Sequence, residues 1–82
     1  MTVDDSVFLT GGAGFIGTAL ARHFLEQGAR VTVFDVFVRD AMQYFPEVAK
    51  HPNLRLVKGD VRDLAAVKAA IGDASLVFHL AA

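Results

Sequence analysis

The chain has 82 residues, so it forms at most one small domain. Its formal net charge of −1, with acidic and basic residues interspersed, argues against nucleic-acid binding, and the absence of cysteine excludes disulfides and thiolate metal sites. No apolar run reaches transmembrane length and Met1–Asp5 carries acid where a signal peptide needs base, so we expect a cytoplasmic protein without membrane contact.

The first third of the chain predicts a strand, a helix and a second strand. Val7-Phe8-Leu9 is apolar without alternation, as in a buried parallel strand. Helical spacing follows over 15–27, and Gly28 stands where a helix stop is expected. The β-branched run over 30–34 predicts the second strand.

The rest of the chain predicts two further strands and two helices. Pro46 disfavours helical geometry at Phe45, so we expect a loop and then a short helix over 46–50. The other elements are a strand over 54–57, a helix over 64–71 capped by Asp63 and ended by Gly72, and a strand over 75–80.

This alternation defines the expected fold. The connections are too long for hairpins, so the strands are parallel with right-handed crossovers. The prediction is an α/β fold, β-α-β-α-β-α-β, which is half of a doubly wound sheet with strand order 3-2-1-4. One helix is expected on one face of the sheet and two on the other.

A glycine-rich loop joins the first strand to the first helix. Its glycines fit G-x-G-x-x-G as Gly12, Gly14 and Gly17, or G-x-x-G-x-x-G with Gly11 in place of Gly12. Either spacing supplies a tight turn and a close backbone approach to a pyrophosphate. The first-turn N–H groups of Phe15 and Ile16 are the expected phosphate donors, and the alternative is a glycine-rich turn without a ligand.

Asp35 ends the second strand, 24 positions after Gly11. An acidic residue about 20 positions after the glycine loop accepts hydrogen bonds from the adenosine ribose, although it can also be an ordinary loop carboxylate. A 2′-phosphate ~4 Å away would be repelled by about 1 kcal/mol per charge pair in water and about 4 at an effective dielectric near 20. NAD is therefore favoured over NADP, and nearby Arg39 moderates that preference.

Gly59-Asp60-Val61-Arg62-Asp63 follows the third strand. Asp60 is placed to accept from an adenine amino group, and Val61 offers a backbone contact and an apolar wall. The simpler interpretation is a turn and a helix cap. The glycine loop makes the adenine role the favoured one.

Four motifs together resemble one protein family: TGGAGFIG over 10–17, Asp35, GDVRD over 59–63 and VFHLAA over 77–82. They are similar to the extended short-chain dehydrogenase/reductases, and within them to the NAD-dependent epimerase/dehydratases that act on sugar nucleotides. The resemblance implies that residues 1–82 are an N-terminal, Rossmann-type NAD(P)-binding half-domain.

The resemblance also implies a role for each matching position. Phe15 and Ile16 would hold the pyrophosphate, and Asp35 the ribose. Asp60 and Val61 would frame the adenine. The residues that would line the middle and nicotinamide-ribose side of the cofactor are Leu80, Ala81 and Ala82.

The chain departs from the family in two ways. Val36 stands where the family often has Asn, which removes one side-chain contact to the adenosine end. The family's Tyr-x-x-x-Lys catalytic pair is missing, because Tyr44, the single tyrosine, is followed four residues later by Val48. The resemblance therefore implies a cofactor half that is not catalytic alone.

Two alternative functions remain open. One is a truncated or engineered Rossmann fragment with a folding or self-assembly role: Leu76–Leu80 would form an exposed apolar edge, so we expect a homodimer through that edge or through the uncovered sheet face. The other is a different nucleotide binder, such as a methyltransferase. His79, inside the fourth strand, is predicted to be a packed, hydrogen-bonded core residue.

Overall fold

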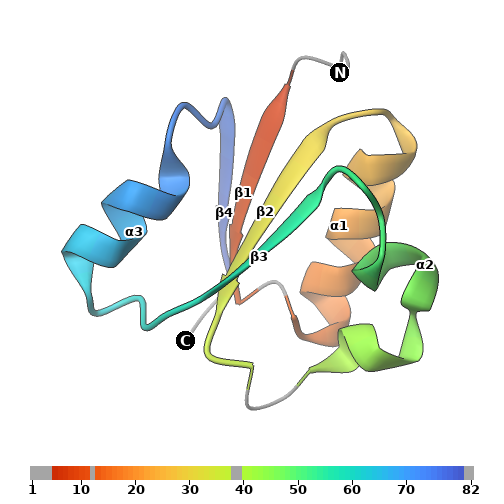
Figure 1. Ribbon diagram of the computed structural model, residues 1–82, viewed down its shortest axis with the longest axis horizontal. Coiled ribbons are helices and arrows are strands. Elements are labelled where there is room, and N and C mark those ends of the chain that lie inside the picture. The colour runs from red at the N-terminus through yellow and green to blue at the C-terminus, as the bar shows by residue number, and fades with distance from the viewer. Residues whose placement is uncertain (1–4, 12, 38–39, 81–82) are drawn as a thin grey trace.

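The computed structural model describes residues 5–11, 13–37 and 40–80 (Figure 1). Four parallel strands form one sheet in the order β3-β2-β1-β4. Their bounds are β1 Ser6–Thr10, β2 Arg30–Asp35, β3 Leu54–Lys58 and β4 Leu76–His79. The predicted strand order 3-2-1-4 is confirmed.

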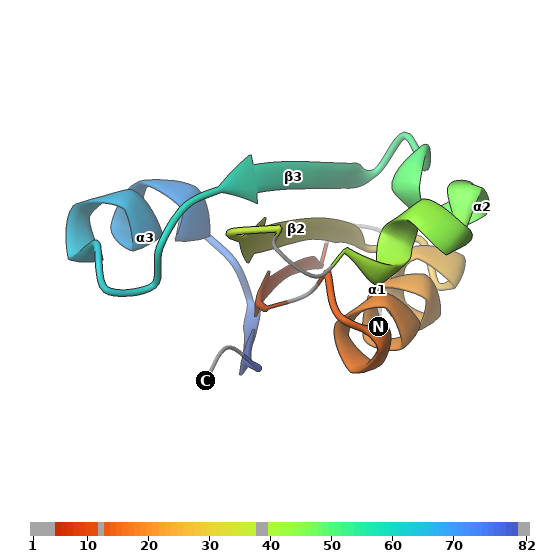
Figure 2. The same cartoon turned by 90° about the horizontal axis from the view of Figure 1, so that it is seen from below.

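The helices cover both faces of the sheet (Figure 2). Helices α1 (Phe15–Glu26) and α2 (Pro46–Ala49) lie on one face, and α3 (Leu64–Ile71) lies on the other. The predicted two-and-one arrangement is confirmed, because the crossover from β3 to β4 passes on the opposite side from the first two crossovers. In the described part of the chain, no helix has the length and apolarity needed to cross a membrane.

The central strands are apolar on both sides because both sides are packed. Val7 and Leu9 of β1 belong to the core under α1, while Phe8 between them belongs to the smaller core under α3. Phe8 meets Phe34 of β2 there, with ring centroids 6.0 Å apart. The sequence of β1 does not alternate between polar and apolar residues because both faces of the strand are buried.

The predicted helix ends are confirmed by hydrogen bonds. The Asp63 carboxylate accepts from the N–H of Ala66 at 3.1 Å and caps α3, which ends at Ile71 before Gly72. Helix α1 ends at Glu26, two residues before Gly28. These local signals are reliable because each satisfies backbone groups that a helix end leaves unpaired.

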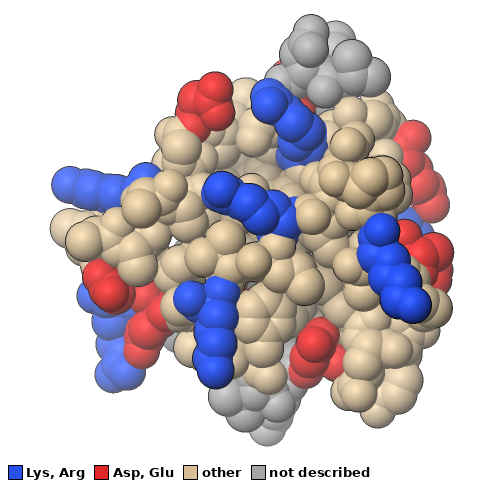
Figure 3. Space-filling model, in the orientation of Figure 1, with Lys and Arg blue, Asp and Glu red and all other residues tan. Residues whose placement is uncertain are grey.

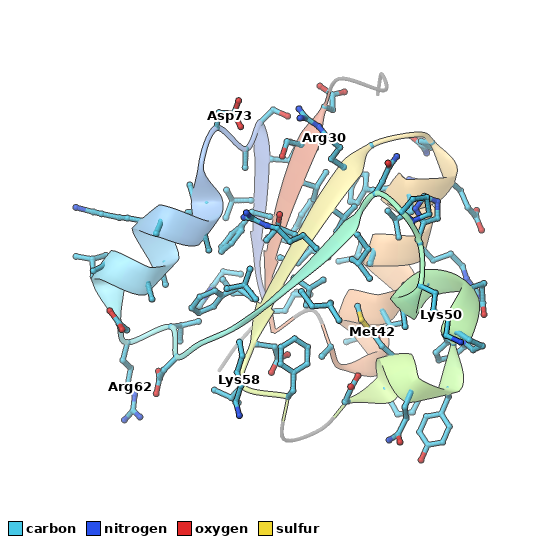
Figure 4. The ribbon with its side chains drawn as sticks, in the orientation of Figure 1. Arg30, Met42, Lys50, Lys58, Arg62 and Asp73 are labelled. Carbon is cyan, nitrogen blue, oxygen red and sulfur yellow. The ribbon has the colours of Figure 1, made fainter. Side chains whose placement is uncertain are left out.

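One element lies outside the prediction, a 3-10 helix over Ala41–Tyr44 (η1). Asp40 caps it, with its carboxylate accepting from the N–H of Met42 at 2.9 Å. Met42, labelled in Figure 4, is buried in the core under α1. Phe37 and Phe45, which flank this segment, pack against the same core.

The prediction that His79 lies in the core is wrong, although its hydrogen bond is present. Its side chain is exposed, and its Nδ1 lies 2.6 Å from Thr10 Oγ1. The reason is the position of β4 at the edge of the sheet, where a strand has one neighbour in place of two.

Gly59 is required by packing at the end of β3. A Cβ there would lie 2.7 Å from Cε2 of Phe34 and would overlap Cζ of the same ring, which is fully buried. We predict that Gly59→Ala lowers the free energy of unfolding by about 1–3 kcal/mol, since the ring would have to shift from its packed position against Phe8. Urea denaturation measures this, with Lys58→Ala on the exposed side as the control, and equal midpoints for the two variants would contradict it.

Candidate functional site

The predicted site residues follow the carboxyl ends of the strands. In a parallel sheet all carboxyl ends lie on the same side, which is the lower end of the strands in Figure 1. The crossovers from β1 and from β3 leave toward opposite faces, so the strand order reverses between β1 and β4, the position beside which doubly wound folds bind their ligands.

The glycine loop begins with a sharp turn at Gly11. This residue has φ of 72°, and its N–H donates to the Phe34 carbonyl at 2.9 Å. Its own carbonyl accepts from the N–H of Gly14 at 3.4 Å. Gly11 is therefore explained by its left-handed backbone, which ties the loop to β2.

Gly14, by contrast, has no structural need to be glycine. It is the N-cap of α1 with an ordinary extended backbone, φ −73° and ψ 177°. A Cβ there would meet its nearest neighbour, the Gly11 carbonyl oxygen, at an ordinary 3.8 Å. Among the described residues, nothing near Gly14 would be displaced by a Cβ, so the backbone here is open to close approach.

The helix end beside Gly14 suits an anion. No side chain caps it, and the first bond back to the cap runs from the Thr18 N–H to the Gly14 carbonyl at 2.8 Å. The N–H groups of Phe15, Ile16 and Gly17 precede that bond at the positive end of the helix. The side chains of Phe15 and Ile16 are exposed, whereas Gly17 is buried.

Asp35 holds two loops at once. Its Oδ2 accepts from the N–H of Ala13 at 3.1 Å, and its Oδ1 accepts from the N–H of Phe37 at 2.9 Å. Each carboxylate oxygen has a second lone pair, so two further donors, such as ribose hydroxyls, can still bind.

Ala13 ties the glycine loop to the chain after β2. It is fully buried, and its carbonyl accepts from the N–H of Ala41 at 2.7 Å while its own N–H binds Asp35. The loop is thus fixed from both sides before any ligand arrives. Sequence reasoning did not find this role, because an alanine inside a glycine motif carries no signal of it.

The residues predicted to bind the adenosine end of the cofactor line one pocket of about 370 Å³. It contains four of the predicted site residues, Gly11, Asp35, Asp60 and Val61. The other lining residues are Phe34, Val36, Gly59 and Arg62. Its volume falls within the usual range for small-ligand sites.

The remaining predicted residues lie outside that pocket. Gly14 and Phe15 line a neighbouring hollow of about 470 Å³ on the other side of the loop. Leu80 lies beside the end of β1, where its N–H donates to the Thr10 carbonyl at 2.9 Å. Gly12, Arg39, Ala81 and Ala82 are outside the described residues.

Arg62, labelled in Figure 4, forms an ion pair with the Asp60 carboxylate. Its Nη2 lies 2.6 Å from Oδ2, its Nε lies 3.1 Å from both oxygens, and its backbone N–H donates to Oδ1 at 2.8 Å. The side-chain hydrogen bonds from Arg62, followed by the backbone one, lower the pKa of Asp60 to about 2. Asp60 is ionised at neutral pH with or without this shift, and it accepts hydrogen bonds there without donating any.

The described residues offer binding chemistry without a catalytic pair or a metal site. Tyr44 is exposed, and Val48, four residues later, is buried in the core. Among the same residues, no three His, Asp or Glu side chains gather as metal ligands.

Known proteins match over almost all of this chain. Residues 7–82 match the NAD dependent epimerase/dehydratase family. The short-chain dehydrogenase/reductase family 42E member 1 of Xenopus laevis is 36% identical over 77 residues, covering 94% of this chain and 18% of that protein. The chain spans about a fifth of the length of the curated relatives that it matches.

Solved structures match equally well. The Bordetella bronchiseptica enzyme WbmH, in complex with NAD+, is 38% identical with a TM-score of 0.83, covering 95% of this chain and 26% of that one. The UDP-Glc/GlcNAc 4-epimerase of Campylobacter jejuni is 25% identical with a TM-score of 0.81, covering 96% and 25%.

The Asp60–Arg62 pair generates a prediction about proton binding. In Arg62→Ala the side-chain hydrogen bonds that lower the Asp60 pKa are lost while the backbone N–H of residue 62 still donates, so the pKa should rise from about 2 part of the way toward the usual 3.8. Any stability from this pair is present above pH 4 and lost as the pH falls through 2. A carbon-13 NMR titration of the Asp60 carboxyl measures it, and identical midpoints in the two proteins would exclude the pairing.

Proposed function

Because this chain belongs to the NAD dependent epimerase/dehydratase family, we propose that it binds NAD(H) as the cofactor half of a sugar-nucleotide epimerase- or dehydratase-like oxidoreductase. The observation that carries the proposal is Gly14, a glycine that neither the backbone nor the packing requires, at an uncapped helix start. A solved relative that is 38% identical holds NAD+, which supports the same ligand here.

The cofactor is assigned to the site in three parts. The adenine lies by Asp60 and Val61, and Asp35 accepts from the ribose hydroxyls. The pyrophosphate lies against Gly11 and Gly14, with the N–H groups of Phe15 and Ile16 as donors and Gly17 allowing close helix packing. The nicotinamide side follows Leu80, Ala81 and Ala82.

The adenosine and pyrophosphate parts each have a physical reason in the described geometry. Asp35 keeps unused lone pairs after binding Ala13 and Phe37. Asp60 is ionised at neutral pH, and it can accept the amino hydrogens of adenine in place of a bond from the exposed Arg62 side chain. The N-terminus of α1 supplies partial positive charge to the pyrophosphate without a lysine or arginine.

The chain's own contribution is binding and orientation. Bound NAD supplies hydride transfer, which is the chemistry of the nicotinamide. Tyr44 and Val48 do not form the Tyr-x-x-x-Lys pair, so the residues that move protons in a catalytic cycle belong to another part of a longer enzyme. This chain by itself holds the cofactor and does not turn over substrate.

A serine at position 14 separates ligand binding from folding. Ser is a preferred N-cap residue, so Gly14→Ser should keep or slightly raise the stability of α1. Its Cβ occupies the space assigned to the pyrophosphate, so NAD affinity should fall by about tenfold or more. Isothermal titration with NAD and a thermal melt measure both quantities on one sample.

Gly72→Ala is the matched control. Gly72 has φ of 56°, and no described atom outside its chain neighbours lies within 4 Å of where its Cβ would be. It lines neither the pocket beside Asp35 and Asp60 nor the hollow beside Gly14 and Phe15. Alanine there is strained and should cost about 1–2 kcal/mol of stability while NAD affinity stays unchanged. Equal NAD affinities for Gly14→Ser and the unmodified chain would refute the assignment.

Asp35 is expected to set the preference for NAD over NADP. In Asp35→Asn the repulsion of a 2′-phosphate disappears, at a value of about 1 kcal/mol or more per charge pair. NAD affinity should fall with the lost acceptor, while the ratio of NADP to NAD affinity rises by about tenfold. Parallel titrations with both cofactors measure the ratio, and an unchanged ratio would show that Asp35 does not face the ribose.

A further inference from the structure

Two carboxylates, Asp35 and Asp60, line the same pocket but differ in how many hydrogen bonds they accept. Asp35 accepts one on each oxygen, both from backbone N–H groups. Asp60 accepts two on each: Oδ1 from the backbone N–H and Nε of Arg62, and Oδ2 from Nε and Nη2 of the same residue. A carboxylate offers about four acceptor positions. An adenine amino group that enters this pocket therefore meets Asp60 already filled by the chain itself.

The hydrogen bonds that fill Asp60 are of two kinds. The backbone N–H of Arg62 donates to Oδ1 at 2.8 Å, within a turn in which the Asp63 N–H donates to the Asp60 carbonyl at 2.9 Å. These two bonds orient the carboxylate whatever the Arg62 side chain does. The guanidinium belongs to a side chain that is 88% exposed. Exposed ion pairs are weak because water solvates both partners, so the guanidinium can leave while the carboxylate stays in place.

We propose that the Arg62 guanidinium competes with adenine for the Asp60 carboxylate, so that it occupies the empty pocket and has to leave before the amino group of the base binds there. The inference rests on the proposed NAD site and adds to it a residue that lowers the affinity for NAD. The competition applies only to a base that donates a hydrogen bond to Asp60. Arg62 therefore also lowers the preference of the pocket for adenine over a 6-oxo purine, which has no amino group at that position.

Removing Arg62 also removes a positive charge, which on its own weakens the binding of an anionic dinucleotide. Lysine and arginine side chains stand apart from one another on the face shown in Figure 3, so one of them can be removed without dismantling a basic patch. Lys58 is exposed, lies with Arg62 at the lower end of the strands in Figure 4, and does not line the pocket. Lys58→Ala is therefore the matched control for the lost charge.

The test compares NAD with nicotinamide hypoxanthine dinucleotide, in which a carbonyl oxygen replaces the amino group of the adenine. Titration should show that Arg62→Ala binds NAD about two- to fivefold more tightly than Lys58→Ala, the range expected when one exposed ion pair no longer has to be broken. Arg62→Ala should bind the hypoxanthine dinucleotide no more tightly than Lys58→Ala does.

NMR of the Arg62 Nε–H group detects the displacement directly in the unmodified chain. Saturating NAD should shift this signal toward that of a fully hydrated arginine, and the hypoxanthine dinucleotide should leave it in place. Equal or weaker NAD binding by Arg62→Ala relative to Lys58→Ala, or an Nε–H signal that NAD does not shift, overturns the inference while the proposed function stands. No NAD binding by the unmodified chain or by either variant overturns both.

Discussion

The Asp35 carboxylate is the interaction on which the site depends. It accepts backbone N–H groups from Ala13 in the glycine loop and from Phe37 after β2. Phe37 has φ of 59°, a left-handed backbone that is unfavourable for a phenylalanine, and this bond together with packing against the core holds it there. The carboxylate thus fixes the backbone on two sides of the pocket that it lines with Gly11, Asp60 and Val61.

The glycines near the site are explained by different structural features. Gly11 is required by its backbone angle, and Gly59 by the buried ring of Phe34. Only Gly14 of these three has no such reason among the described residues, so it is the position at which the proposed pyrophosphate would explain the glycine. A glycine motif becomes evidence for a cofactor once the glycines that the fold itself needs have been set aside.

Sequence reasoning anticipated the fold because each element carries a local signal. The apolar run of β1, the helical spacing after Phe15 and the Asp63 cap act within a few residues and need no tertiary information. The misses depend on contacts between distant residues. The exposure of His79 follows from the place of β4 in the sheet, and the role of Ala13 depends on a hydrogen bond from Ala41.

Part of the site was also predictable from the sequence. Parallel strands end on the same side of the sheet, so Gly11, Asp35, Asp60 and Val61 could be expected in one pocket. The hydrogen bonds from Arg62 to Asp60 could not be expected, because they depend on the conformation of an exposed side chain.

An NMR titration of the unmodified chain with NAD tests the central claim most directly. Another hollow, also of about 370 Å³, lies at the opposite end of the strands, beside Arg30, Asn53 and Gly72. This reference hollow serves as an internal control. If NAD binds as proposed, the signals of the reference hollow stay unchanged while saturable shifts appear in the amide signals of Gly11, Gly14, Phe15, Ile16, Asp35, Asp60 and Val61. No shift at millimolar NAD, or shifts confined to the reference hollow, would contradict it.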